Sequence, residues 1–199
     1  MLDPFWPTTQ KARRDEGCWN RTLGPEQYRW LTKTLAESKA RLKLIFIHHL
    51  VGGLDRNNRG GAEAVPFYEW GGKNEDGSDG FKARRPGWEM PIHALLVRHH
   101  VSAVFHGHDH FYSRQELDGI VYQLVPQPSS WPPRKRSPAD EYGYAAGASL
   151  PGPGHLRVAV TPGKSTVELV CSCLPEDEKT GRLNGEVVHA YAMEPRPPR

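Results

Sequence analysis

Apolar residues recur at two different spacings in the first half of the chain and predict alternating helices and strands. Residues 25–39 have apolar side chains at helical spacing with a charged outer face, which predicts an amphipathic helix. The apolar run 42–47 follows and has the length of a buried strand. A second helix is predicted to begin at Pro91, and a second buried strand follows at 101–105. Because helix followed by strand occurs twice, we predict an α/β fold.

Turn signals in the second half of the chain predict antiparallel hairpins. Asp118-Gly119 and Pro162-Gly163 each separate two segments with strand character. In the first hairpin, segment 112–116 pairs with 120–125, and in the second, segment 156–160 pairs with 166–171. A last strand is expected at 186–191. The C-terminal half is therefore predicted to be mostly antiparallel.

One long segment, 52–87, has no hydrophobic period. It is rich in glycine, asparagine and charged residues. Loops of this length are uncommon inside a domain unless they are functional or mobile. We therefore expect this segment to be a functional or mobile loop.

Length and composition limit the classes of protein to consider. The 199 residues suit one domain, which we expect over 1–192, with a disordered proline-rich tail at 193–199. No apolar run approaches the roughly 18 residues of a membrane span, so no membrane partner is expected. A net charge of +3 gives no reason to expect a nucleic-acid partner. The first residues carry no secretory signal, and the compartment is left open.

The three cysteines, Cys18, Cys171 and Cys173, are too few for a disulfide framework. Cys171 and Cys173 stand two residues apart in a predicted strand, where a disulfide would strain the backbone. We expect all three to be reduced and structural.

Histidines gather at the ends of the two buried strands. Five of the ten lie within residues 99–110, and a local histidine-rich tract is typical of metal binding. His108 and His110 follow the strand 101–105, after Gly107, which we expect to permit a tight turn. His48 ends the other buried strand. Because open α/β sheets place ligands at the carboxyl ends of their strands, these three imidazoles are predicted to converge as a metal site.

These residues also resemble a known family. The segments Ile45–His49 and Val104–His110 are similar to the fourth and fifth motifs of the calcineurin-like metallophosphoesterases, above all of members similar to purple acid phosphatases. The helix containing 26–31 and the two later hairpins also follow the family's order. The resemblance spans nearly the whole chain.

The resemblance implies a fold, a reaction and ligands. The chain would be the C-terminal portion of a four-layer αββα sandwich, with a mixed sheet and antiparallel hairpins at its C-terminal end. The family hydrolyses phosphate esters with a hydroxide held between two divalent or trivalent ions, which could be Fe, Zn or Mn. By position, His48 and His108 would bind one ion and His110 the other.

Three upstream motifs of the family are absent from this sequence. These are Asp-x-His, Gly-Asp-x-x-Asp and Gly-Asn-His, which supply most of the ligands and the bridging carboxylate. The chain therefore resembles the C-terminal half of a metallophosphoesterase. Alone, it is expected to hold one ion or none and to hydrolyse esters slowly, and its partner would be the missing N-terminal half.

Several further residues have both a functional and a structural interpretation. His49 is a catalytic candidate that either supports a metal ligand or faces the substrate, or it is simply packed. Asp109 either accepts a hydrogen bond that orients a metal-binding imidazole or is a solvated turn residue. Arg84 and Arg85, near Trp88, either bind the ester or are solvated loop charges. His99 and His100 are expected to face water at the end of a helix, and His106 to lie in the core.

Three functional hypotheses remain open from the sequence. The first is metal-dependent hydrolysis of a phosphate ester. The second is a noncatalytic metal-binding or partner module derived from a phosphoesterase. The third is a truncated product without a stable fold, because half of a sandwich leaves apolar sheet surface uncovered.

Overall fold

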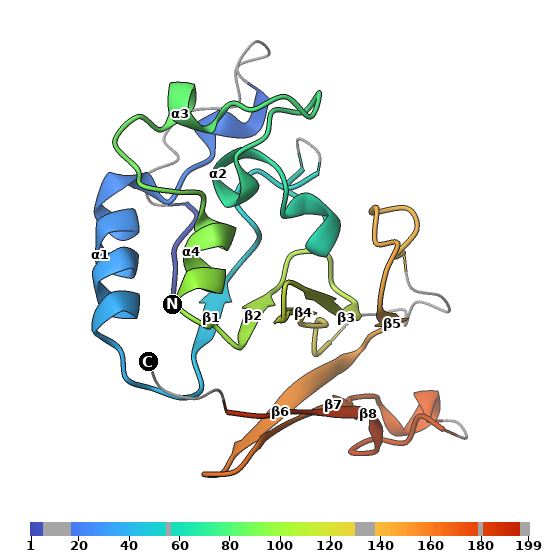
Figure 1. Ribbon diagram of the computed structural model, residues 1–199. Helices are drawn as coiled ribbons and strands as arrows, with labels where there is room; N and C mark the ends of the chain where they lie inside the picture. Colours follow the sequence, from blue (N-terminus) through green and yellow to red (C-terminus); the bar gives the residue numbers. More distant parts are fainter. Residues whose placement is uncertain (6–16, 55–56, 130–137, 179–180, 196–199) are drawn as a thin grey trace.

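The computed structural model of the chain has three layers (Figure 1). It describes residues 1–5, 17–54, 57–129, 138–178 and 181–195. Helices cover one face of a five-stranded sheet, and a three-stranded sheet lies against the other face. The predicted α/β class is confirmed, as are a mixed sheet and antiparallel hairpins at the C-terminal end. Three layers of the expected four-layer sandwich are present among the described residues.

The central sheet has the strand order β1-β2-β4-β3-β5. Its strands are β1 (Leu44–Ile47), β2 (Ala103–His106), β3 (Tyr112–Leu117), β4 (Ile120–Leu124) and β5 (Ala148–Leu150). β1, β2 and β4 run parallel, whereas β3 is antiparallel to both β4 and β5. The carboxyl ends of the three parallel strands therefore meet at one edge of the sheet.

The second sheet contains only antiparallel pairs. It has the order β6-β7-β8, with strands β6 (Gly154–Val160), β7 (Ser165–Cys171) and β8 (Val187–Met193). Val167 and Met193 of this sheet pack against Ala103, Phe105 and Val121 of the central sheet. The three cysteines are free, as expected.

Two longer helices cover the opposite face of the central sheet, α1 (Gly24–Glu37) and α4 (Ile92–Arg98). Both begin beside a proline, which has the fixed φ of a first helical position. The apolar stripes of both helices belong to the same buried cluster as Ile45, Val104 and Ile120 of the sheet. Helical spacing in the sequence was sufficient to predict both helices because these side chains form one face.

Hairpin turns follow the sequence signals closely. In the turn between β3 and β4, Asp118 and Gly119 have φ values of 50° and 73°. Two positive φ values in a two-residue loop match the twist of the flanking strands, which explains why Asp-Gly predicts this hairpin.

The segment 52–87 differs from the expectation of a loop without regular elements. It contains three short helical elements: η2 (Ala62–Ala64), α2 (Tyr68–Gly71) and α3 (Phe81–Arg84). Trp70 is fully buried, and its indole N–H donates to the Tyr122 hydroxyl at 3.0 Å. Helices of three or four residues are too short to show a hydrophobic period, so the sequence pattern could not reveal them.

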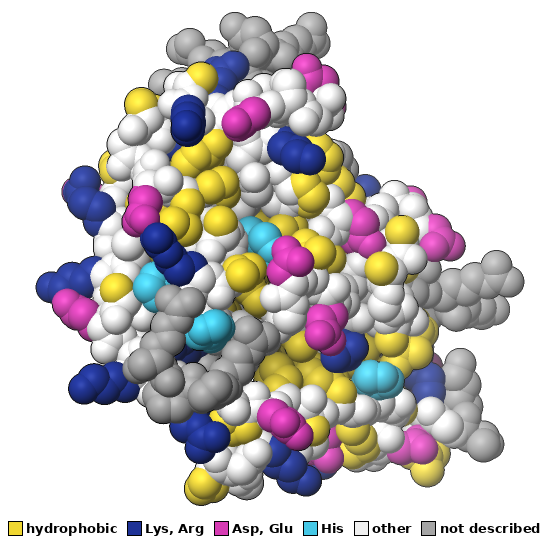
Figure 2. Space-filling view, in the orientation of Figure 1, with side chains coloured by type: hydrophobic (Ala, Val, Ile, Leu, Met, Phe, Trp, Pro, Cys, Tyr) yellow, Lys and Arg dark blue, Asp and Glu magenta, His cyan; other side chains and the backbone are white. Residues whose placement is uncertain are grey.

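The remaining short elements are η1 (Gly17–Asn20) and η3 (Pro175–Asp177). β8 continues to Met193, the first residue of the expected tail, and residues 196–199 lie outside the described part. Among the described residues, no helix is both long and apolar enough to span a bilayer. Basic and acidic side chains are interspersed on the face shown in Figure 2, in agreement with the small net charge.

Candidate metal centre

Strand register brings the two histidine motifs together. β1 and β2 are parallel neighbours, with Ile47 opposite His106. One further backbone hydrogen bond, from Gly107 N–H to the His48 carbonyl at 2.8 Å, continues the pairing past both strand ends. His48 and His108 therefore leave the sheet at the same level.

In the turn after β2, the residues with an unusual backbone φ angle are the two histidines and not the glycine. His108 and His110 have φ values of 83° and 65°, which are uncommon for residues with a side chain. A Cβ atom on Gly107 would lie 3.5 Å from the His48 carbonyl oxygen, an ordinary contact. The expectation that Gly107 permits the tight turn is therefore wrong. Strained backbone of this kind is concentrated at functional sites.

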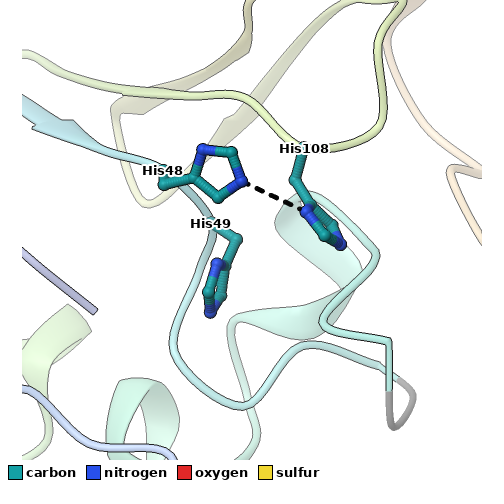
Figure 3. Close-up of side chains that lie close together, drawn as sticks. All are labelled: His48, His49 and His108. Atoms are coloured by element: carbon teal, nitrogen blue, oxygen red, sulfur yellow. Dashed lines mark hydrogen bonds between the residues drawn. The ribbon is translucent and has the colours of Figure 1, made fainter. Parts of the chain in front are cut away.

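Three imidazoles converge at this edge of the sheet: those of His48, His49 and His108 (Figure 3). One nitrogen from each ring lies within 4.8 Å of the others. His48 Nε2 and His108 Nδ1 are 3.3 Å apart. Among the histidine, cysteine, aspartate and glutamate side chains of the described residues, these three form a group that could hold a metal ion.

The second nitrogen of the His108 ring determines its tautomer. Nε2 lies 2.5 Å from the Asn57 carbonyl oxygen, which can only accept a hydrogen bond. Nε2 therefore carries the proton, and Nδ1 presents a lone pair toward His48. Metal-binding histidines typically donate their other N–H to a carbonyl or carboxylate in this way.

The environment favours the neutral form of two of these rings, those of His48 and His49. Burial lowers the pKa of His49 to about 3, with a smaller contribution from the positive charges that His108, His48, His106 and Arg21 would carry. Burial and the neighbouring His108 and His110 also lower the pKa of His48. Neutral imidazole is the form that binds metal.

Two observations test whether these residues fit a metal ion. Two nitrogen ligands about 2.0–2.1 Å from a tetrahedral zinc ion lie roughly 3.3–3.4 Å apart. The separation of His48 Nε2 and His108 Nδ1 has this value. In addition, His49 Nδ1 is buried without a hydrogen-bond partner among the described residues. The His48 and His108 nitrogens are therefore spaced as two ligands of one ion, and the His49 nitrogen lies within 4.8 Å of both.

The N-terminal residues cover one side of the site. The Phe5 ring lies 5.3 Å from the His48 ring and 5.2 Å from the His49 ring, measured between centroids. The Leu2 N–H donates a hydrogen bond to the Phe46 carbonyl, and this bond holds the N-terminal residues beside β1. No sequence signal pointed to Phe5, because it stands in a segment without periodicity.

His110 has a different position from that of the other predicted ligands. It is exposed and lines a cavity of about 410 Å³ that His108 also lines. The structure thus brings together His48 and His108 with His49, and places His110 in the neighbouring cavity. The other lining residues are Arg21, Asn57, Arg59, Asp109 and Tyr142.

Two arginines give this cavity a basic character. Arg59 lies over the Tyr142 ring, with its guanidinium carbon 4.0 Å from the ring centroid. Arg21 lies near enough to His49 to lower the pKa of that imidazole. Neither arginine could be selected from the sequence, because the two stand in separate loops without a motif.

Arg84 and Arg85, the basic residues selected from the sequence, line a different cavity. The Arg85 guanidinium forms a hydrogen-bonded ion pair with the buried Glu69 carboxylate. His106 is buried in β2, as expected, and burial lowers its pKa to about 3. His99 and His100, at the end of α4, are half-buried.

Asp109 is buried, and its hydrogen bonds connect two loops to the turn that carries His108. Its Oδ2 accepts hydrogen bonds from Gly60 N–H at 3.1 Å and from the Tyr144 hydroxyl at 2.7 Å. Burial raises the pKa of Asp109, and these two hydrogen bonds lower it. Asn57, and not Asp109, accepts the hydrogen bond from His108.

Tyr144→Phe is expected to destabilise the fold through Asp109. Removing the hydroxyl leaves a buried carboxylate with one hydrogen bond fewer, at a cost of about 1–3 kcal/mol in the free energy of unfolding. Urea denaturation measures this loss. Tyr142→Phe is the control, because that half-exposed ring contacts Arg59 through its face. Equal stabilities of the two variants would contradict the role of the Tyr144–Asp109 bond.

Comparison with known proteins finds a similarity to a solved structure but none to a family model or a curated sequence. No family model and no curated protein sequence matches the chain. Among solved structures, the chain is similar to purple acid phosphatase PPD1 from yellow lupin (Lupinus luteus) seeds, with 17% identity and a TM-score of 0.45. The match covers 87% of this chain and 29% of the phosphatase, so this chain spans less than a third of that protein. At these values, the likeness does not assign the chain to that family.

Proposed function

We propose that this chain carries the histidine side of a metal-dependent phosphoesterase site. The observation that supports this proposal most directly is the convergence of three imidazoles beside a cavity that contains two arginines. A metal ion bound there would activate water and neutralise charge on phosphoryl oxygens. The motif resemblance to metallophosphoesterases agrees with this chemistry.

Arg21 and Arg59 are the groups that we expect to bind the phosphate oxygens. A guanidinium matches phosphate geometry through two parallel N–H donors. Arg59 is stacked on Tyr142, so its in-plane N–H groups keep a defined direction. His108 lines this cavity while its Nδ1 faces His48, so a bound ester would lie beside the imidazole group.

The available ligands limit the number of metal ions that this site can bind. Among the residues that the structure describes, the group consists of three imidazoles, with no carboxylate to bridge two cations. Two cations a few ångströms apart repel strongly unless an anion lies between them. We therefore propose one bound ion for the described residues, and slow hydrolysis. Zinc, iron and manganese all accept imidazole ligands.

Turnover of 4-nitrophenyl phosphate with added zinc, manganese or iron tests the proposed function. We expect slow hydrolysis that chelator abolishes and that His48→Ala reduces to background. His155→Ala is the control, because His155 is exposed on β6, away from the site. Hydrolysis that is unchanged in His48→Ala would contradict the proposal.

Arg59→Gln tests the substrate contact separately. Loss of a charge-assisted hydrogen bond to phosphate is expected to raise KM roughly tenfold, with a smaller effect on kcat. Arg41→Gln replaces an exposed arginine outside the cavity and should leave KM unchanged. Equal KM values for both variants would remove Arg59 from the proposed contact.

A noncatalytic metal-binding module is the second candidate. It is favoured by the same absence of a carboxylate among the three converging ligands. Calorimetric titration with zinc distinguishes the candidates. Stoichiometric zinc binding without any turnover of the ester would support the module.

A further inference from the structure

A second cavity is lined by residues from the beginning of α1 and from the loop that follows α3. Its volume is about 730 Å³, within the range of small-molecule sites. Its characteristic lining is aromatic and basic: Trp19, Tyr28, Trp88, Arg29, Arg84 and Arg85. It shares no lining residue with the cavity beside His108.

One wall of this cavity is a stacked aromatic pair. The rings of Tyr28 and Trp88 are 3.9 Å apart between centroids, with an angle of 15° between their planes. The Tyr28 hydroxyl donates to the Met90 carbonyl at 2.8 Å and accepts from Met90 N–H at 3.1 Å. These hydrogen bonds hold the loop that carries Trp88 against α1, so the wall is formed before any ligand binds.

Arg85 holds the second wall in place. Its guanidinium lies 5.4 Å from the Trp19 ring centroid and 5.7 Å from that of Trp88. It donates to the Glu69 carboxylate and to the Trp19 carbonyl. Glu69 is fully buried, so the charge of Arg85 is balanced inside the protein. Arg85 therefore supports the cavity and does not supply it with net charge.

Arg29 and Arg84 supply the charge that faces solvent. Both are exposed at the cavity, and none of the lining residues within the described part of the chain is acidic. Trp19 and Tyr28 are buried, so the half-buried Trp88 presents the aromatic surface to this cavity. A cavity with this aromatic surface and with exposed guanidinium groups is suited to a ligand that is both planar and anionic. Aromatic rings stack on such faces, and guanidinium groups bind phosphate oxygens.

We propose that this cavity binds a mononucleotide, with its base against Trp88 and its phosphate at Arg29 and Arg84. The proposal does not depend on metal binding or on hydrolysis. It assigns Arg84 a role in a site separate from the histidines, while Arg85 anchors the walls.

Titration with AMP in the presence of chelator, followed by tryptophan fluorescence and calorimetry, tests this proposal. We expect saturable binding of AMP, and binding at least tenfold weaker for adenosine and for ribose 5-phosphate, since each lacks one of the two features. Chelator keeps metal out of the histidine site. Comparable binding of all three compounds, or no saturable binding of AMP, would overturn the proposal.

Variants locate the binding site. Arg84→Gln is expected to weaken AMP binding about tenfold or more through loss of a charged hydrogen bond. Arg41→Gln is the control, an exposed arginine that lines neither cavity. His108→Asn should retain full affinity for AMP. Loss of AMP binding in His108→Asn with retention in Arg84→Gln would place the nucleotide at the histidines and overturn the proposal.

Discussion

Zinc affinity is expected to fall by more than roughly 10–100-fold when His108 is replaced by asparagine. Loss of a residue that only supports a metal ligand already costs about that much, and His108 is proposed as a direct ligand. Asparagine is the suitable replacement because His108 has a φ of 83°, and asparagine tolerates positive φ better than alanine does. The substitution thus removes the imidazole with little added backbone strain.

Calorimetric titration with zinc measures this loss, with His155→Asn as the control. His155 is an exposed histidine on β6 and should leave zinc affinity unchanged. Circular dichroism of each variant shows whether the fold is retained. Equal zinc affinities in His108→Asn and the wild type would exclude His108 as a ligand.

Glu69→Gln is expected to lower the free energy of unfolding by about 3–5 kcal/mol, because it leaves the Arg85 charge unpaired in a largely buried position. The Glu69 carboxylate accepts hydrogen bonds from Arg85, from the Thr22 hydroxyl and from Leu23 N–H. Glutamine keeps the volume and removes the charge. The predicted loss therefore reports the ion pair and not a cavity.

Urea denaturation of Glu69→Gln and of Glu37→Gln makes the comparison. Glu37 pairs with Lys33 at 3.9 Å on the surface of α1, with both side chains more than two-thirds exposed. An exposed pair contributes about 0–1 kcal/mol, so Glu37→Gln should change stability little. Similar stabilities of both variants would show that Arg85 finds other acceptors when Glu69 loses its charge.

The helices and hairpins were predictable from local pattern alone. α1 and α4 present one apolar stripe each to the sheet, and Asp118-Gly119 forms the tight turn that its φ preferences favour. The short strand β5 was not predicted, because three residues within a proline-rich region carry no alternation. Short helices in 52–87 were missed for the same reason.

The candidate site was predictable in part. His48 and His108 were placed correctly at the ends of neighbouring parallel strands, because apolar runs identify buried strands and parallel strands end at one edge. His49 joins them although neighbouring strand residues point to opposite faces. β1 ends at Ile47, so the alternation no longer applies at His48 and His49.

By itself, the sequence determined the α/β class, the positions of the longer elements and the two strand ends that carry histidines, because these depend on residues close together in the chain. The tertiary structure alone decided which groups surround those histidines. Asn57 fixes the His108 tautomer, and Arg21 and Arg59 charge the adjoining cavity. These residues come from different loops, and their positions depend on long-range packing and hydrogen bonds that no local spacing encodes.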